Sequence, residues 1–435
     1  MRFMKSGPLK GVITVPGDKS ISHRAVMFGA LADGITEVTN FLQGADCLST
    51  IRCFRQLGID IENNSSSDKV IIHGKGLYGL SKPSGMLDVG NSGTTMRLLS
   101  GILCGQNYEV SLNGDESIQK RPMGRIMTPL TQMGADIKSL KGNDRSPLVI
   151  NASPDRKSKL TGIHYYSPVA SAQIKSCVLL AGLYADGETS VTEPSLSRNH
   201  TELMLSEFGA KIKAADNTAT IFPNPDLKGR KISVPGDISS AAYFIAAGLI
   251  IPNSEIVIKN VGINPTRDGI LRVCRQMGAD ITLDNVFDNG GEPVADLVVK
   301  YSDLIGTEIG GDVIPTLIDE IPIIAILACC AKGQTVIKDA AELKVKESNR
   351  IDVMVNNLSM MGADITATDD GMIINGGKLL KGSEVDSKFD HRIAMSFAVA
   401  GLLAEGETSI LGAECVDISY PNFYEDLKKL YKWRR

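Results

Sequence analysis

The chain has no apolar run long enough to cross a lipid bilayer. No stretch reaches 18 uninterrupted apolar residues, and the apolar segment "IPIIAILACCA" (321–331) is too short to span one. The first residues, "MRFMKSGPLKG", contain no apolar signal core. We therefore expect a cytoplasmic protein without a membrane span or a secretory leader.

Basic residues are not in excess either, since 46 Lys and Arg stand against 50 Asp and Glu, for a formal net charge of −4. A protein that binds nucleic acid through overall positive charge is therefore disfavoured, and any basic cluster must be local. The eight cysteines contain no CxxC pair and mostly lie in apolar runs, which favours reduced core thiols over disulfides or zinc ligands. They are Cys47, Cys53, Cys104, Cys177, Cys274, Cys329, Cys330 and Cys415.

Several catalytic motifs are absent as well. The chain has no GxSxG elbow, no HExxH, no Walker motif and no GxGxxG after an expected strand. The five histidines show no metal-ligand spacing, so we expect no metal. The absence of these motifs disfavours the enzyme classes that use them. We expect instead a group-transfer reaction between small molecules that needs no metal.

What the chain does contain is an internal repeat. One phrase, in which a helix end and a glycine lead into a strand, recurs roughly every 70 to 85 residues. Its copies are "RQLGIDI" (55–61), "TQMGADI" (131–137), "SEFGAKI" (206–212), "RQMGADI" (275–281) and "SMMGADI" (359–365). A second phrase of helix, tight turn and strand lies between them, as in "ALADGITEVTN" and "VAGLLAEGETSILG". The spacing predicts about six βαβ-containing units in an α/β protein.

Two related segments divide this series of units. The segments "GVITVPGDKSISHRAVMFGALADG" and "RKISVPGDISSAAYFIAAGLIIPN" share a strand, a VPGD turn and an apolar helix. We interpret each VPGD turn as a crossing between two lobes. One lobe is therefore expected over 20–235 and the other over 1–19 and 236–435.

Cations gather where helices are expected to begin. The stretch "PGDKSISHRA" places Lys19, His23 and Arg24 at the start of a helix expected from about Ser20 to Leu31, with Ser20 or Ser22 as its cap. Because a helix N-terminus is already electropositive, this order favours a bound anion. Other expected helix starts carry Arg97, Lys120, Arg121, Arg125, Lys175, Arg198, Lys346, Arg350, His391 and Arg392. A single such cation is more often solvated or locally ion-paired, but the recurrence predicts a shared site for small anions.

The second VPGD segment is an internal control for this interpretation. Where the first segment has Lys19 and Arg24, the second has Ile238 and Tyr243. The scaffold therefore does not need these cations.

Lys and Arg would stabilise charge in a transfer between small anionic molecules, and an Asp, Glu or Lys would move the proton.

A pair of carboxylates stands at the head of the apolar stretch "TLIDEIPIIAILACC". Burial of Asp319 or Glu320 would raise the pKa of the carboxyl group, whereas a helix N-terminus would lower it. Asp319 is therefore a candidate general base or a plain N-cap, and the sequence leaves both open.

Seven motifs span Pro16 to Met395: "PGDKSISHRA", "GNSGTTMRLLSG", "KRPMGR", "SAQIKS", "LIDEIP", "KESNRI" and "DHRIAM". Together they resemble the EPSP synthase family, the 3-phosphoshikimate 1-carboxyvinyltransferases. The resemblance implies the two-lobe enolpyruvyl transferase fold, an inside-out α/β barrel with six βαβαββ repeats, three per lobe. It also implies transfer of the enolpyruvyl group of phosphoenolpyruvate to the 5-hydroxyl of shikimate 3-phosphate, with release of phosphate. The implied partners are these small molecules, without nucleic acid, membrane or cofactor, and a monomer is expected.

The resemblance also implies site residues, motif by motif. Those expected to contact shikimate 3-phosphate are Lys19, Ser20, Arg24, Ser171, Ala172, Gln173, Arg198, Asp319 and Lys346. Those expected to contact phosphoenolpyruvate are Lys19, Gly93, Arg121, Gln173, Arg350 and Arg392. Asp319 would take the proton of the 5-hydroxyl with Lys346 as its partner, and Glu347 would protonate the methylene carbon. Lys19 and Lys346 are the other candidates for that acid.

The chain departs from the family pattern at three positions. Leu98 stands where many members have Pro, Ala172 where others have Ser, and Ile418 where some have Lys, so no C-terminal residue is assigned to the site. Gly93 leaves space that an alanine would fill, which predicts inhibition by glyphosate.

Two other functions are alternatives to this one. Related enolpyruvyl transferases that act on UDP-N-acetylglucosamine typically have Lys-Asn where this chain has Lys19 and Ser20, and a Cys in the loop where "DESIQKRP" has none. A non-enzymatic two-lobe binder of phosphorylated metabolites would need the cations but not Asp319 and Glu347.

Overall fold

The computed structural model describes residues 1–64, 68–151 and 160–431. The chain divides into two units, the N-terminal unit (Gly17–Val234) and the C-terminal unit (Met1–Pro16 with Pro235–Arg435). Each unit has a hydrophobic core of its own. That these units are lobes bounded after residues 19 and 235 stays a prediction.

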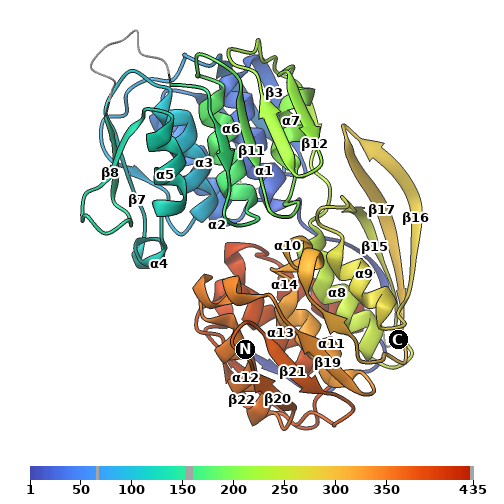
Figure 1. The fold of residues 1–435 in the computed structure, drawn as a ribbon. Helices are drawn as coiled ribbons and strands as arrows, with labels where there is room; N and C mark the ends of the chain where they lie inside the picture. The colour runs from blue at the N-terminus through green and yellow to red at the C-terminus, as the bar shows by residue number, and fades with distance from the viewer. Residues whose placement is uncertain (65–67, 152–159, 432–435) are drawn as a thin grey trace. The chain divides into compact units, whose positions relative to one another are not determined.

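The N-terminal unit contains three four-stranded sheets built on one plan (Figure 1). In each sheet the first strand pairs parallel with the second, and the third pairs antiparallel with both of its neighbours. In spatial order the sheets are β14 (Lys231–Ser233), β3 (Asp33–Thr39), β5 (Val70–Lys75) and β4 (Asp60–Asn63); β6 (Leu87–Asp88), β7 (Val110–Asn113), β9 (Leu148–Asn151) and β8 (Asp136–Ser139); β10 (His164–Tyr166), β11 (Thr189–Thr192), β13 (Thr218–Ile221) and β12 (Ile212–Ala215).

The C-terminal unit follows the same plan in two sheets and a shorter version of it in a third. The sheets are β2 (Lys10–Thr14), β15 (Glu255–Gly262), β17 (Glu292–Lys300) and β16 (Asp280–Asn289); β18 (Glu308–Ile309), β19 (Gln334–Ile337), β21 (Met372–Asn375) and β20 (Asp364–Ala367); β22 (Glu384–Asp386), β23 (Thr408–Leu411) and β1 (Arg2–Phe3). Six sheets in an α/β chain confirm the predicted repeats, three in each unit.

The helix that directly precedes the second strand of each sheet in the chain is buried along nearly its whole length. In the N-terminal unit these helices are α1 (Lys19–Leu31), α3 (Gly93–Cys104) and α6 (Ala172–Gly182), and α3 packs against both others. In the C-terminal unit they are α8 (Ile238–Ile250), α11 (Ile321–Cys330) and α13 (His391–Gly401), which contact one another. Helices that are apolar on all sides must be enclosed in this way.

Shorter or more polar helices complete the repeats. They are α2 (Ala45–Gln56), α4 (Glu116–Lys120), α5 (Gly124–Gln132), α7 (His200–Glu207), α9 (Gly269–Gln276), α10 (Ile314–Leu317), α12 (Arg350–Met360) and α14 (Phe423–Tyr431), with the 3-10 turns η1 (Gly311–Val313), η2 (Ala341–Val345) and η3 (Ala413–Ile418). The glycine of the repeated phrase has a positive φ of 84° to 103° in all five copies, so it ends the preceding helix as predicted.

The two VPGD turns carry the chain from one unit to the other. Strand β2 pairs with β15 of the C-terminal unit, but the helix that follows it, α1, belongs to the N-terminal unit. Strand β14 pairs with β3 of the N-terminal unit, and α8 then belongs to the C-terminal unit. Each turn therefore joins a strand of one unit to a helix of the other.

Side-chain oxygens cap the starts of α1, α3 and α13. The expectation that Ser20 or Ser22 caps α1 is wrong, because the helix begins one residue earlier and Asp18 accepts a hydrogen bond from the Ile21 amide at 2.9 Å. A short carboxylate at the N-cap also complements the helix dipole. Ser92 caps α3 and Asp390 caps α13.

All eight cysteines are free and six of them are buried, in keeping with the expected core thiols. Over residues 1–64, 68–151 and 160–431, no single helix is long and apolar enough to span a membrane. The helices Gly311–Leu317 and Ile321–Cys330 are long and apolar enough when taken together, by length and composition only, but the chain bends by 112° between them.

Candidate active site

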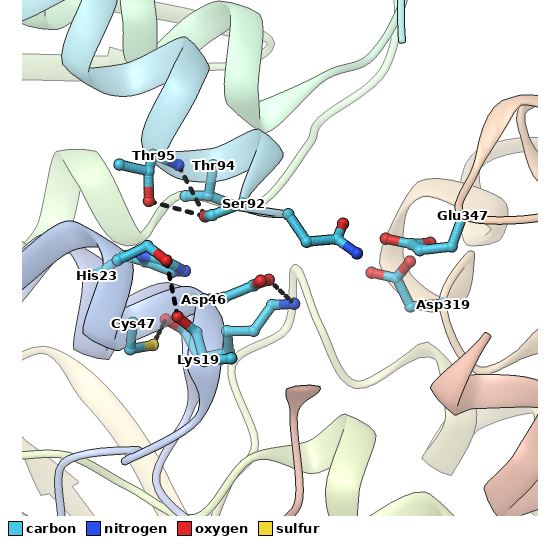
Figure 2. Close-up of polar contacts among 12 residues, drawn as sticks. Lys19, His23, Asp46, Cys47, Ser92, Thr94, Thr95, Asp319 and Glu347 are labelled. Atoms are coloured by element: carbon cyan, nitrogen blue, oxygen red, sulfur yellow. Dashed lines mark hydrogen bonds and ion pairs between the residues drawn. The ribbon is translucent and has the colours of Figure 1, made fainter. Parts of the chain in front are cut away.

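The first cluster of predicted site residues lies at the start of α1. The ammonium of Lys19 is 2.7 Å from Oδ2 of Asp46, which lies in the first turn of α2 (Figure 2). The Lys19 side chain is 20% exposed, whereas Asp46 is buried. Ser20 is half-buried beside it. A buried carboxylate thus holds a partly exposed ammonium at the beginning of a helix.

Arg24 lies one turn deeper and is only 3% exposed. Its Nε donates to Oγ1 of Thr201 at 2.7 Å, and its Nη2 donates to Oγ of Ser176 at 2.8 Å. Its Nη1 donates to the carbonyl of Ser20 at 3.0 Å. Arg24 therefore ties α1 to α6 and α7, and its predicted contact with substrate stays a prediction.

The second cluster surrounds the start of α3. Arg97 donates to Oε1 of Gln173, whose Nε2 donates in turn to Oγ1 of Thr94 at 3.1 Å. A Cβ built on Gly93 would lie 3.1 Å from Nη1 of Arg121 and 3.5 Å from Nη1 of Arg97. Two guanidinium groups therefore flank a helix N-terminus whose first amides have no partner within the helix, an arrangement that suits a small anion.

The third cluster lies at the start of α6, where Ala172 is the first helical residue. The Ser171 amide donates to Oε1 of Glu193 at 2.7 Å, and the Ser197 hydroxyl donates to Oε2 of the same carboxylate at 2.7 Å. One buried glutamate thus fixes both the cap of α6 and the residue that precedes Arg198. Arg198 itself is half-buried.

Lys175 is not part of this surface. Its side chain is 2% exposed, and its ammonium pairs with Glu193 at 3.0 Å and with Glu202 at 2.8 Å. The expectation that Lys175 belongs to an anion site is therefore wrong, because its partners are carboxylates of its own unit. The local ion pair is the correct interpretation at this helix.

In the C-terminal unit the predicted residues converge on Arg350. Its Nε lies 2.8 Å from Asp390, its Nη2 lies 2.7 Å from Glu347, and its Nη1 lies 3.4 Å from Asp319. Burial alone would lower the pKa of Arg350, but Asp390, Glu347 and Asp319 together outweigh burial and raise it. Lys346 approaches the same oxygen of Asp319 at 3.6 Å.

Asp319 is not the N-cap of α11, so that alternative is wrong. The residue before the helix is Glu320, and the carboxylate of Asp319 turns instead to the cations of the following repeat. Asp319 keeps 18% of its side chain exposed, as does Glu347. The structure therefore brings Asp319 together with Lys346, Glu347 and Arg350, which follow it by 27 to 31 residues in the sequence.

Arg392 lies in the first turn of α13 and is 7% exposed. Burial disfavours its charged form, but Tyr243, Asp319 and Glu320 outweigh burial and raise the pKa of the guanidinium. Burial raises the pKa of Tyr243 to about 12, against the opposing effect of Arg392. Tyr243, which replaces Arg24 in the second VPGD segment, is thus a neutral neighbour of a cation.

Sequence reasoning named Glu320 but missed two buried carboxylates that hold cations, Asp46 beside Lys19 and Glu193 beside Lys175. It also missed Arg267, which donates to Ser239 at 2.6 Å and to Asp237 at 3.0 Å, while Glu320 accepts a hydrogen bond from the same Ser239. Nothing local in the sequence marks the two missed carboxylates, since each meets its cation across tertiary packing. Within the part of the chain that the structure describes, no cluster of three His, Cys, Asp or Glu could hold a metal ion.

Nearly the whole chain is similar to proteins of one known family. The sequence pattern of the family described as "EPSP synthase (3-phosphoshikimate 1-carboxyvinyltransferase)" matches residues 3–427. The 3-phosphoshikimate 1-carboxyvinyltransferase of Thermoanaerobacter sp. (strain X514) is 58% identical over 422 residues, which cover 97% of this chain and 98% of the relative. This chain belongs to the EPSP synthase family. The family member from Brevibacillus brevis is 56% identical over 430 residues, with 99% of both chains covered.

Solved structures support the same assignment. An EPSP synthase from Acinetobacter baumannii superposes with a TM-score of 0.89 at 47% identity, covering 99% of this chain and 98% of that one. The enolpyruvyl transferase NikO from Streptomyces tendae has a TM-score of 0.80 at 17% identity, covering 99% and 96%, and shows the fold alone. The predicted family, the enolpyruvyl transferase fold and the transferase class are confirmed. The alternative that acts on UDP-N-acetylglucosamine is not favoured.

Proposed function

We propose that this protein transfers the enolpyruvyl group of phosphoenolpyruvate to the 5-hydroxyl of shikimate 3-phosphate and releases inorganic phosphate. The reaction is a step of the shikimate pathway to chorismate and the aromatic amino acids. The observation that carries the proposal is the EPSP synthase match over residues 3–427. Cations at the starts of buried helices in both units support it, because both substrates are anions.

In this proposal shikimate 3-phosphate is contacted from the starts of α1 and α6. Ser171 and Arg198 lie nearest its phosphate, and Gln173 contacts the same substrate. The role of Glu193 supports this, because it fixes the Ser171 amide and the Ser197 hydroxyl next to Arg198. The remaining proposed contacts are Lys19, Ser20, Arg24, Ala172, Asp319 and Lys346.

Phosphoenolpyruvate is assigned to a second set of cations. The proposed contacts are Lys19, Gly93, Arg121, Gln173, Arg350 and Arg392. The guanidinium groups of Arg97 and Arg121 beside Gly93 support this assignment, because a planar fork of N–H donors matches a carboxylate or phosphate. Gly93 keeps the approach to the first amides of α3 free of a side chain.

The proposed chemistry is an addition followed by an elimination. An acid donates a proton to the methylene carbon of phosphoenolpyruvate, which leaves C2 cationic. The 5-hydroxyl oxygen then bonds to C2 and gives its proton to Asp319. In the elimination the methyl group returns a proton to the deprotonated acid and the bond between C2 and the phosphate oxygen breaks. Inorganic phosphate leaves, and the hydroxyl proton held by Asp319 leaves with it.

We assign the acid to Glu347 and the base to Asp319. Both carboxylates are partly exposed and both contact Arg350, which fixes their positions. Lys346, 3.6 Å from Asp319, stabilises the charge of the base. Lys19 and Lys346 are the other candidates for the acid. We also propose that the protein is a monomer and that it acts in the cytoplasm, a compartment in which its free thiols would stay reduced.

The first test is phosphate release from phosphoenolpyruvate by the purified protein without added metal. Release is expected with shikimate 3-phosphate and not with UDP-N-acetylglucosamine. Release only with the second acceptor would overturn the substrate assignment, and release with neither would favour a binding protein. The variants Asp319→Ala and Glu347→Ala should each lower kcat by about a hundredfold or more while the protein stays folded.

A further inference from the structure

A chain of buried hydrogen bonds leads from His23 to the cap of α3. Nδ1 of His23 is 2.7 Å from Oγ1 of Thr50 on α2, which is 2.7 Å from Oγ1 of Thr95 on α3. The Thr95 hydroxyl and amide both donate to Oγ of Ser92, at 2.7 and 3.1 Å (Figure 2). All four side chains are completely buried. No step of the proposed reaction uses them.

The direction of these bonds follows from counting hydrogens. A hydroxyl group has one hydrogen, and that of Thr95 goes to Ser92. Thr95 must therefore accept from Thr50, and Thr50 must accept from His23. His23 is thus protonated on Nδ1. The opposite tautomer would leave the hydrogen on Nε2, which has no hydrogen-bond partner among the described residues.

The imidazole is neutral as well as fixed in one tautomer. Burial lowers the pKa of His23 to about 3; Asp46 opposes this shift, and Lys19 and Arg24 add to it. A neutral ring can sit between two cations at the electropositive end of a helix, where a third cation would be repelled.

His23 also fixes how α1 and α2 are aligned. Lys19 pairs with Asp46, and His23, four residues after Lys19, pairs with Thr50, four residues after Asp46. Residues four apart lie on one face of a helix, so the two helices are joined by two contacts one turn apart. The outer contact carries Lys19, a proposed substrate ligand, and the inner one continues to Ser92, the residue before Gly93.

We propose that His23 is a positioning residue that holds Lys19 and the amide end of α3 in place for phosphoenolpyruvate, through Thr50, Thr95 and Ser92. This inference rests on the proposed function. Its structural part does not, because the tautomer of His23 can be measured without any substrate.

The first test is a long-range ¹H–¹⁵N correlation spectrum of the protein labelled on histidine. The His23→Asn variant identifies the His23 signals among the five histidines. We expect a protonated Nδ1 and an unprotonated Nε2 that do not change between pH 5.5 and 8. A protonated Nε2, or a charged ring in this range, would overturn the proposal whether or not the protein turns over substrate.

The second test is a comparison of KM and kcat. Thr50→Val and His23→Leu interrupt the hydrogen-bond chain, and we expect KM for phosphoenolpyruvate to rise about tenfold in each. His23→Asn keeps an amide donor near the position of Nδ1 and should recover most of the affinity. The matched control is Thr36→Val, because the Thr36 hydroxyl is also fully buried but has no hydrogen-bond partner among the described residues.

These outcomes separate the inference from the proposed function. An unchanged KM in Thr50→Val, or an equal rise in Thr36→Val, would refute a positioning role even in an active enzyme. If the parent protein shows no turnover, the proposed function fails while the tautomer still decides the structural claim. If His23→Leu does not fold, Thr50→Val and Thr36→Val still give the comparison.

Discussion

Arg350 is a buried side chain that forms ion pairs with three carboxylates of the C-terminal unit. It contacts Asp319, Glu347 and Asp390, and Asp390 is also the cap of α13. A buried cation with three carboxylate partners is strongly coupled to folding, because loss of the cation leaves buried negative charge without compensation. We therefore expect Arg350 to stabilise the fold and to fix the positions of Asp319 and Glu347, the proposed base and acid.

We expect Arg350→Met to destabilise the protein by about 3–5 kcal/mol and to abolish turnover. Urea unfolding followed by circular dichroism measures the first effect, and phosphate release measures the second. The control is Arg272→Met, because Arg272 forms a half-exposed pair with Asp268 at 2.9 Å and should contribute at most about 1 kcal/mol. Equal losses in the two variants would contradict the argument.

His23 makes the stability of the fold depend on pH. Its pKa is about 3 in the folded protein and 6.5 in the unfolded chain, so only the unfolded chain binds the proton between these values. Because the folded pKa is lowered, the stability is fully present above pH 6.5 and is lost as the pH falls towards 3. The buried ring lies near Asp46, Lys19, Arg24 and Asp18, whose charges set this shift.

The loss amounts to about 2 kcal/mol between pH 7.5 and pH 5, at about 1.4 kcal/mol per pH unit below 6.5. The measurement is the free energy of unfolding of the parent and of His23→Asn over this range. Other titrating groups are common to both proteins, so the difference between them isolates His23. A difference that stays constant with pH would show that His23 is not buried as a neutral ring.

Gly93 is the residue on which the predicted sensitivity to glyphosate depends. A Cβ there would lie 3.1 Å from Nη1 of Arg121, so Gly93→Ala must displace a proposed phosphoenolpyruvate ligand. We expect KM for phosphoenolpyruvate to rise about tenfold and inhibition by glyphosate to be lost, while KM for shikimate 3-phosphate changes little. Steady-state kinetics with and without millimolar glyphosate check this. Unaltered activity of the parent protein at millimolar glyphosate would refute the predicted inhibition.

At the scale of elements, the helix starts were predictable and the partners of their cations were not. A polar motif followed by an apolar run predicted α1 to within one residue of its observed start, and the glycine of the repeated phrase predicted where the preceding helices end. Both signals are local in sequence. Asp46 contacts Lys19 because α1 packs on α2. Lys175 was expected at an anion site, but in the fold it is buried between Glu193 and Glu202. Contacts that depend on tertiary packing are not marked by any local sequence pattern.

The turn between β2 and α1 depends on a close approach at Gly17. A Cβ on Gly17 would lie 1.9 Å from the carbonyl oxygen of Asn40, which is backbone and cannot move aside. We expect Gly17→Ala to lower the free energy of unfolding by about 3 kcal/mol or more. The control is Gly85→Ala, where an added Cβ meets nothing within 4 Å and φ is not positive. Similar unfolding curves for both variants would contradict this interpretation.

At the scale of the whole molecule, the two units differ in how the chain builds them. The N-terminal unit is one continuous segment that contains β14, the outer strand of its first sheet. The C-terminal unit needs residues 1–16 as well, because β1 and β2 supply strands to two of its sheets. The sequence predicted the six repeats, but which strand completes which sheet is decided by pairing between residues that are 194 or more positions apart.

We therefore expect the fragment 17–234 to fold alone and the fragment 235–435 to fail, because the latter lacks two strands and leaves the edge of β15 unpaired. The folded fragment should show a cooperative thermal transition by circular dichroism. It should also release no phosphate from phosphoenolpyruvate with shikimate 3-phosphate, because the proposed base Asp319 and the proposed acid Glu347 both belong to the other unit. Phosphate release by the fragment 17–234 alone would show that neither Asp319 nor Glu347 is needed for the proposed reaction. A cooperative thermal transition in the fragment 235–435 would show that the C-terminal unit folds without β1 and β2.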